Sequence, residues 1–331
     1  MTDLSAVTIL KEGNFRNHPS ITDSCQCLHI NNHFNPKTLY KNTPVAEYLL
    51  WQEVHKLLTE NPGRDFIQYI SIPTDFHKCI NNYYLEFHVD GDSLINIMHR
   101  HREHPEHRID IQSILLDVAR GVSYLNNLGI CHMDVKPDNI IVQGSKQSAK
   151  LIDLGRSTKI GQTLNLFKSF NTSSNQQDIG QIYPYDPPLK LYHEQWFIDK
   201  LHTSMSFTQA QQLSVAITNY LVRHRQYINI FTDIPVKTEL QLTQVYRTDD
   251  PFRDIIELSN RPDLVSVYIS QEHRSWDTFS LGVTILQCHY IAPSYLLELA
   301  VNMCRPDACT RPSLSQVLKI MIKGLDIPVR S

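Results

Sequence analysis

The stretch that decides the fold reads His132-Met133-Asp134-Val135-Lys136-Pro137-Asp138-Asn139, and Leu151-Ile152-Asp153-Leu154-Gly155 follows it a little later in the chain. Short strand-like runs at residues 140–142 and 150–152 lie between the polar parts of these stretches, and this pattern predicts a small hairpin. A hairpin would bring the polar groups before its first strand close to those after its second. One short region therefore gathers acidic, basic and amide side chains.

These side chains suit a site that handles phosphate and a divalent metal ion. Mg²⁺ prefers hard oxygen ligands and shares them between one or two protein groups and phosphates, so Asn139 and Asp153 are the candidate metal ligands. A second carboxylate, Asp134, can accept or orient the proton of an attacking hydroxyl, while Lys136 can steady charge on a transferred phosphoryl group. The alternative interpretation is an acidic turn between two strands of another fold.

The same residues resemble the catalytic and metal-binding loops of the eukaryotic protein kinases. The family's H-R-D-x-K-x-x-N is similar to residues 132–139, and its D-F-G is similar to residues 153–155. Lys136 stands two residues after Asp134, which resembles the serine/threonine branch rather than the tyrosine branch. The divergence of the remaining chain is similar to that of kinases carried by large DNA viruses.

The resemblance implies an α+β fold of two lobes. A small β-rich N-lobe with one helix is expected at residues 1–84, a hinge at 85–92, and a larger, mainly helical C-lobe at 93–331. A family-atypical insertion spans about 165–255, and a segment of this length predicts ordered accessory structure, including a helix over about 207–227. ATP and Mg²⁺ or Mn²⁺ are the implied cofactors.

The residues that would hold the nucleotide are harder to assign. Gly13 is the only glycine where the family carries a glycine-rich loop, so it either approaches phosphate or forms a simple turn. Thr43-Pro44 predicts the start of a helix, and Glu53 on this helix is our choice for the family's phosphate-lysine partner. We favour Lys41 over Lys37 as that lysine, because Lys37 follows a proline that removes a ladder hydrogen bond.

Two further segments resemble later parts of a kinase. Residues 83–94 are similar to the last N-lobe strand and hinge, where the backbone around Glu86 would meet the adenine. Apolar residues at helical spacing predict a helix from about Ile109 that ends near Gly129 and supports the catalytic loop.

The C-terminal part carries candidates for structural support. Residues 277–282 are similar to the family's D-x-W-S-x-G helix, with Asp277 as its acid. Arg311 resembles the arginine that pairs with the A-P-E carboxylate, a bidentate geometry that lysine cannot reproduce. Asp263 is the preferred carboxylate, and Pro187-Pro188-Leu189 is the other candidate for the A-P-E position.

Composition places further bounds on function. The 331 residues carry a formal net charge of −3, which gives no electrostatic reason to expect nucleic acid or an anionic membrane as a partner. No apolar run approaches a membrane span, and the seven scattered cysteines are typical of reduced thiols. The expectation is an intracellular protein, cytoplasmic or nuclear, whose oligomeric state the sequence leaves open.

Three functions agree with these residues. The first is a serine/threonine protein kinase that uses ATP, with Asp134 as catalytic base and protein substrates. The second is a pseudokinase scaffold, which the poor glycine loop favours. The third is a small-molecule kinase of the aminoglycoside or choline type. Because Met133 stands where many kinases have the arginine that receives an activation-loop phosphate, we also expect activity without such phosphorylation.

Overall fold

The structure is a computed structural model that describes residues 15–16, 38–60, 65–78, 82–88, 90–144, 147–161, 183–188, 206–246 and 262–325. It divides into two compact units, Met1–Tyr124 with Pro137–Ser157, and Leu125–Lys136 with Thr158–Ser331. Most of the described strands lie in the N-terminal part of the chain and the long C-terminal part is helical, which confirms the expected α+β class. Gly13 and Lys37 lie outside the described residues, so the predictions for them are untested.

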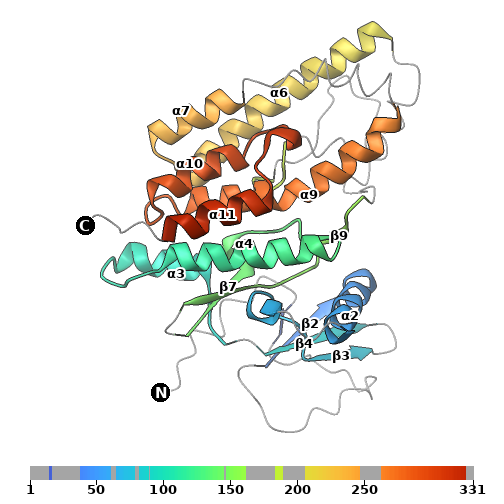
Figure 1. The fold of residues 1–331 in the computed structure, drawn as a ribbon, viewed down its shortest axis with the longest axis vertical. Helices are drawn as coiled ribbons and strands as arrows, with labels where there is room; N and C mark the ends of the chain where they lie inside the picture. The colour runs from blue at the N-terminus through green and yellow to red at the C-terminus, as the bar shows by residue number, and fades with distance from the viewer. Residues whose placement is uncertain are drawn as a thin grey trace. The chain divides into compact units, whose positions relative to one another are not determined.

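The first unit contains an antiparallel sheet of four strands in the order β1-β2-β4-β3; Figure 1 labels β2, β4 and β3. The strands are β1 (Phe15–Arg16), β2 (Thr38–Thr43), β3 (Asp75–Lys78) and β4 (Tyr83–His88). Residues alternate between the two faces of a strand, so Lys41 and Thr43 on β2 are buried while Asn42 between them is exposed. The register sets Lys41 opposite Leu85 and Tyr40 opposite Glu86.

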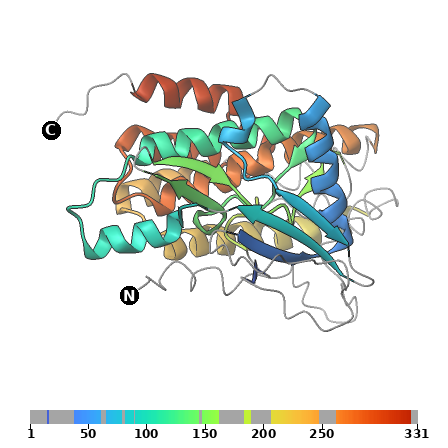
Figure 2. The ribbon, with the colours of Figure 1, turned by 90° about the horizontal axis from the view of Figure 1, so that it is seen from below.

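Helix α2 (Val45–Glu60) lies beside this sheet (Figure 2). It begins just after Thr43-Pro44, as the sequence predicted, and the Tyr48 N–H bonds the Pro44 carbonyl at 3.1 Å. Trp51 is fully buried, and its ring meets that of Phe87 on β4 edge to face, with centroids 5.8 Å apart. Burial of such a side chain contributes about 1.5–3 kcal/mol or more, so this contact fixes which face of α2 turns to the sheet.

The chain after β4 continues within the first unit, and the division into lobes with a hinge at residues 85–92 stays a prediction. Strand β5 (Asp92–Ser93) pairs with β7 (Ile140–Gln143), which pairs with β8 (Ser148–Leu151). The pairing of Ile140 with Leu151 confirms the predicted hairpin. The remaining elements are η1 (Asp65–Gln68), α3 (Leu94–Glu103), α4 (Ile111–Asn127), whose first part belongs to this unit, and η2 (Pro137–Asn139).

The second unit is built around α9 (Pro262–Gln287). Its residues from Trp276 to Leu286 are all buried, and α10 (Ser294–Met303) and α6 (Phe207–Thr232) pack on it. Helix α6 begins where the helical stretch of the insertion was predicted, and α7 (Val236–Val245) contacts α10. The other elements are β6 (Ile130–Cys131), which pairs with β9 (Thr158–Lys159), η4 (Ala308–Thr310) and α11 (Leu314–Leu325). Among the described helices, none has the length and apolar character needed to cross a membrane.

Candidate active site

A buried lysine held between two carboxylates forms the centre of the site in the first unit. Lys41 Nζ lies 2.5 Å from Glu47 Oε1 and 2.6 Å from Asp153 Oδ1. The Thr43 hydroxyl donates to the other oxygen of Glu47. Strand β2 supplies the lysine, the first turn of α2 supplies Glu47, and the segment after β8 supplies Asp153. Charged groups are buried at a cost unless they are paired, and here each charge has a partner of opposite sign.

The loop that carries Asp153 is shaped by backbone geometry. Asp153 has φ of +69°, a conformation that costs an L-residue energy, and its Oδ1 accepts a hydrogen bond from the Gly155 N–H at 2.8 Å. A Cβ on residue 155 would lie 2.9 Å from Asp153 Oδ1 and 3.3 Å from Glu47 Oε2. Glycine at 155 therefore leaves the space in which the carboxylates and the lysine meet.

Asn139 lies at the same end of the hairpin as Asp153. It closes η2 directly before β7, and its carbonyl accepts the Ile152 N–H at 3.0 Å. The Asp153 side chain is 27% exposed, so its oxygens remain accessible to a ligand. A carboxylate and an amide are the hard oxygen donors that Mg²⁺ takes. The donor set of these two predicted residues thus fits a divalent metal ion.

In the second unit, the chain positions Asp134 and Lys136 as an ion pair, with Lys136 Nζ 3.0 Å from Asp134 Oδ2. The Tyr183 hydroxyl donates to Asp134 Oδ1 at 2.6 Å and accepts from Lys136 Nζ at 3.0 Å. Burial alone would lower the pKa of Lys136, but the Asp134 carboxylate and the Tyr183 hydroxyl outweigh it and raise that pKa. Burial, and then the charge of Asp134, raise the pKa of Tyr183 to about 12. At neutral pH the phenol is therefore protonated and Lys136 is charged.

Asp277 supports this loop from α9. Its two carboxylate oxygens accept the backbone N–H groups of His132 and Met133, each at 2.8 Å, and Asn126 Nδ2 adds a third bond at 3.1 Å. Met133 has φ of +62°, an unfavourable conformation that these bonds hold in place. Burial raises the pKa of Asp277, although the surrounding donors oppose this shift. The carboxylate therefore orients the backbone directly ahead of Asp134.

Met133 is fully buried in a cluster with Cys131 and Trp276. The resemblance placed an arginine at this position, where it would receive a phosphate. A charged side chain here would need to leave the apolar cluster or lose its hydration at large cost. The structure thus gives Met133 a packing role.

The carboxylate partner of Arg311, among the described side chains, is Glu272 on α9, at 3.1 Å from Arg311 Nη1. From the sequence, Asp263 is preferred because its distance to Asp277 suits the family; its side chain lies outside the described ones, so that expectation stays a prediction. Pro262 is the first residue of α9, and Glu272 follows nearly three turns later on the same helix. Burial raises the pKa of Glu272, and Arg311 opposes that shift.

The structure corrects the choice of Glu53. Lys41 pairs with Glu47, and Glu53 is exposed on α2. Six residues correspond to a rotation of roughly 240° about a helix axis, so the two acids lie on different sides of α2.

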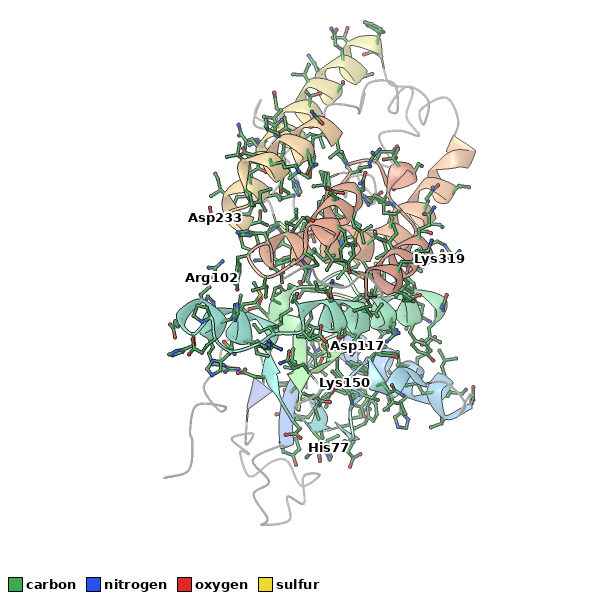
Figure 3. All side chains as sticks on the ribbon, turned by 60° about the vertical axis from the view of Figure 1, so that its left-hand side comes forward. His77, Arg102, Asp117, Lys150, Asp233 and Lys319 are labelled. Atoms are coloured by element: carbon green, nitrogen blue, oxygen red, sulfur yellow. The ribbon has the colours of Figure 1, made fainter. Side chains whose placement is uncertain are left out.

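Glu86 has its side chain 3.1 Å from Nε2 of His77, which is labelled in Figure 3 on the edge strand β3.

Three site residues were not identified from the sequence: Glu47, Tyr183 and Glu272. A signal existed for Glu47, because it continues the spacing of Trp51, Val54 and Leu58, the buried stripe of α2. No local pattern indicated the other two, since Tyr183 meets a carboxylate 49 positions earlier and Glu272 an arginine 39 positions later.

Comparisons with known proteins show similarity to protein kinases. The protein kinase domain family matches residues 24–175. The chain is 28% identical over 142 residues to MAP kinase-interacting serine/threonine-protein kinase 2 of Xenopus laevis. The matched stretch covers 41% of this chain and 29% of that protein. It is 33% identical over 91 residues to serine/threonine-protein kinase SSN3 of Coccidioides immitis, covering 27% and 19%, respectively.

A third similarity, 42% over 43 residues, is to protein kinase MCK1 of Saccharomyces cerevisiae, covering 13% of this chain and 12% of that protein. The matched stretches span less than a third of the length of each of these three relatives. Low identity over a restricted part of the chain agrees with the departures from the family pattern after Gly155. Residues 24–175 of the chain are thus similar to the eukaryotic-type protein kinase domain, at low identity.

Proposed function

We propose that this chain transfers the γ-phosphoryl group of ATP to serine and threonine hydroxyls of proteins. The observation that carries the proposal is the contact of Lys41 with both Glu47 and Asp153. The three groups carry a formal charge of −1, on a glycine-lined loop where Asp153 is partly exposed. An excess of negative charge beside a lysine suits a metal ion and the phosphates that accompany it.

Each residue then has a chemical role. The metal–nucleotide complex supplies an activated phosphoryl group, and Asn139 and Asp153 would hold its metal. Lys41 would contact phosphate oxygens, oriented by Glu47. Asp134 would accept the proton of the acceptor hydroxyl, while Lys136 offsets developing negative charge.

The substrate class is inferred from Lys136 and from the relatives. Lys136 already pairs with Asp134 and lies close to where an acceptor would approach that carboxylate. Two of the relatives described above are named serine/threonine-protein kinases. Small-molecule acceptors are the competing class and enter the test below.

One observation favours a scaffold without catalysis. The Tyr183 hydroxyl already engages both Asp134 and Lys136, so the groups needed for transfer are in use within the chain. A scaffold would bind nucleotide and transfer nothing. The two functions therefore differ in a single measurable quantity, the rate of transfer.

The test is incubation of the purified full chain with γ-labelled ATP and Mg²⁺ or Mn²⁺, beside the Asp134→Asn variant. Generic protein acceptors, choline and an aminoglycoside are offered in parallel. We expect label on serine and threonine of the proteins, and a decrease of roughly 10²–10⁴-fold in the variant. Label only on the small molecules would reassign the substrate class. Nucleotide binding with no transfer to any acceptor would support the scaffold.

We further propose that no other kinase has to activate this chain, because the buried Met133 offers no cation to an activation-loop phosphate. Protein made in a host without kinases that act on it should transfer phosphate with only ATP and metal added. Activity that appears only after treatment with a second kinase would contradict this.

A further inference from the structure

Four polar side chains lie together on the face of the four-stranded sheet that is turned away from α2. Side chains alternate between the two faces along a strand, and Lys41 on β2 points to α2. Its neighbour Tyr40 therefore points the other way, and the register sets Tyr40 opposite Glu86 on β4. Glu86 is in turn opposite Asp75 on β3, and His77 follows two residues later on the same face. Three neighbouring strands thus gather one histidine, two carboxylates and a phenol.

The ring of His77, which is labelled in Figure 3, lies within reach of both carboxylates. Its Nε2 is 3.1 Å from Glu86 Oε2 and 3.9 Å from Asp75 Oδ2, and one ligand atom from each residue lies within 4.8 Å of the other two. In a tetrahedral zinc site with bonds of about 2.0–2.2 Å, neighbouring ligand atoms are roughly 3.3 Å apart. His77 and Glu86 already have nearly this spacing. Only the Asp75 carboxylate, which is 64% exposed, has to turn inward.

Each carboxylate is oriented by a further hydrogen bond. The Phe76 N–H donates to Asp75 Oδ1 at 2.7 Å, so Oδ2 is the oxygen that is left toward His77. The Tyr40 hydroxyl bonds the Glu86 carboxylate. Partners of this kind hold metal ligands in position and affect the metal affinity. The three side chains are therefore arranged before any ion arrives.

The charge at this face favours a cation. Among the side chains that the structure describes, His77 is the only basic one that pairs with Asp75 or Glu86. With a neutral imidazole the three residues carry two negative charges. Burial, and then the charges of Glu86 and Asp75, raise the pKa of Tyr40, as negative charge close to a phenol does. A dication would neutralise both carboxylates.

We propose that Asp75, His77 and Glu86 bind a transition-metal dication of the Zn²⁺ type, with water completing its coordination. An imidazole nitrogen suits Zn²⁺, whereas Mg²⁺ takes oxygen ligands. The site is separate from the one around Lys41 and Asp153, because its ligands lie on the opposite face of the sheet. The metal joins the edge strand β3 to β4 and stabilises the sheet. The alternative is a cross-strand ion pair of protonated His77 that needs no metal.

The experiment uses the full chain without a purification tag, treated with a chelator and returned to buffer that contains excess Mg²⁺. The Mg²⁺ competes for sites made of oxygen ligands alone. Calorimetric titration measures Zn²⁺ binding, and the visible absorption of Co²⁺ in its place distinguishes tetrahedral from octahedral coordination. We expect the natural chain to bind Zn²⁺ with a rise in its thermal unfolding midpoint, and Co²⁺ to show a tetrahedral spectrum.

The variants assign this binding to individual side chains. His77→Gln and Glu86→Gln should each abolish the Zn²⁺-dependent rise, while their midpoints in chelator show that they fold. Tyr40→Phe removes only the hydrogen bond to Glu86 and should weaken binding about 10–100-fold. Zn²⁺ binding that is unchanged in both His77→Gln and Glu86→Gln would overturn the inference.

His55→Gln and His104→Gln are the matched controls. His55 lies on α2 against Phe76, which is on the other face of the sheet. His104 pairs with Glu106 in the histidine-dense stretch 99–107, where metal ions could also bind. Both controls should keep the Zn²⁺-dependent rise. Loss of it in His104→Gln, or no Zn²⁺ binding by the natural chain, would overturn the inference, and neither outcome bears on phosphoryl transfer.

Discussion

Each unit contains a buried cation paired with a helical glutamate, yet the two pairs differ in charge balance. The side chains of Arg311 and Glu272 are both 0% exposed, and the other Arg311 donors bond Ser275 and the carbonyls of Arg305 and Pro306. This pair is neutral, and in the described part of the chain it leaves one buried oxygen, Glu272 Oε2, without a hydrogen-bond partner. Lys41 and Glu47 are nearly as buried, but Asp153 adds a partly exposed carboxylate beside them. A neutral pair that is closed to solvent supports the fold, whereas a cluster with surplus charge and access to solvent is arranged to bind a ligand.

The largest effect should come from removing the surplus charge. Asp153→Asn leaves Lys41 with Glu47 and makes the cluster neutral, so the metal loses its charged ligand. We expect transfer to fall about 10³-fold or more. The thermal unfolding midpoint without nucleotide should stay the same or rise slightly. Retained full transfer would show that the metal is held elsewhere, and a large fall in the midpoint would give this cluster the structural role assigned to Arg311.

The reverse pattern is expected for the neutral buried pair, Arg311 with Glu272. Arg311→Met strands the buried Glu272 carboxylate, and breaking a buried pair in this way costs about 3–5 kcal/mol of unfolding free energy. Urea unfolding followed by tryptophan fluorescence would report the loss, since Trp276 is buried on the same helix. The double variant Arg311→Met with Glu272→Leu removes both charges and should regain much of the stability. No recovery in the double variant would mean that the arginine acts through its backbone contacts.

The sequence indicated the site residues best where they are close together in the chain or belong to one short element. The hairpin that unites Asn139 and Asp153 follows from two short strand runs, and the choice of Lys41 followed from its place on a strand. In both cases a local rule, strand alternation or pairing, fixes the geometry. Contacts over a few residues carry little ambiguity, so these predictions could be made without the fold.

The misassigned partners depend on how elements turn toward each other. Choosing between Glu47 and Glu53 requires the rotation of α2 about its axis, which the buried stripe with Trp51 sets. The sequence contained this stripe, and its phase would have identified Glu47. Glu272 and Tyr183 meet residues far away in the chain, and only tertiary packing selects them among many acids and tyrosines.

The support region of the second unit should also be sensitive to acid. His273, next to Glu272, is buried and accepts the Gly161 N–H on Nδ1 at 3.0 Å. Burial lowers the pKa of His273 to about 4. As pH falls below about 6.5, His273 becomes protonated in the unfolded chain, whereas in the folded chain it stays neutral until about pH 4. Stability should therefore fall across this window, by up to about 3 kcal/mol.

The check is urea unfolding at several pH values for the natural chain and for His273→Gln, which keeps an acceptor for Gly161 and cannot be protonated. Between about pH 6.5 and 4, the natural chain should lose unfolding free energy relative to the variant. Any stability advantage of the natural chain should therefore shrink or reverse as the pH falls. Burial shifts the pKa values of Glu272 and Asp277 upward and gives the opposite slope, but both proteins share that contribution. Parallel curves would show that folded His273 takes up a proton as readily as an exposed histidine.

The smallest effect on stability and transfer is expected for a change of Glu53, and the contrast with Glu47 on the same helix tests which acid serves Lys41. Glu53→Gln alters an exposed position, so its unfolding free energy should change by less than about 0.5 kcal/mol and its transfer rate by less than about twofold. Glu47→Gln, the same chemical change on the buried side, weakens the hold on Lys41 and should slow transfer at least about tenfold. Equal losses in the two variants would mean that α2 can rotate to present either acid, because a helix of fixed phase cannot turn both toward one lysine.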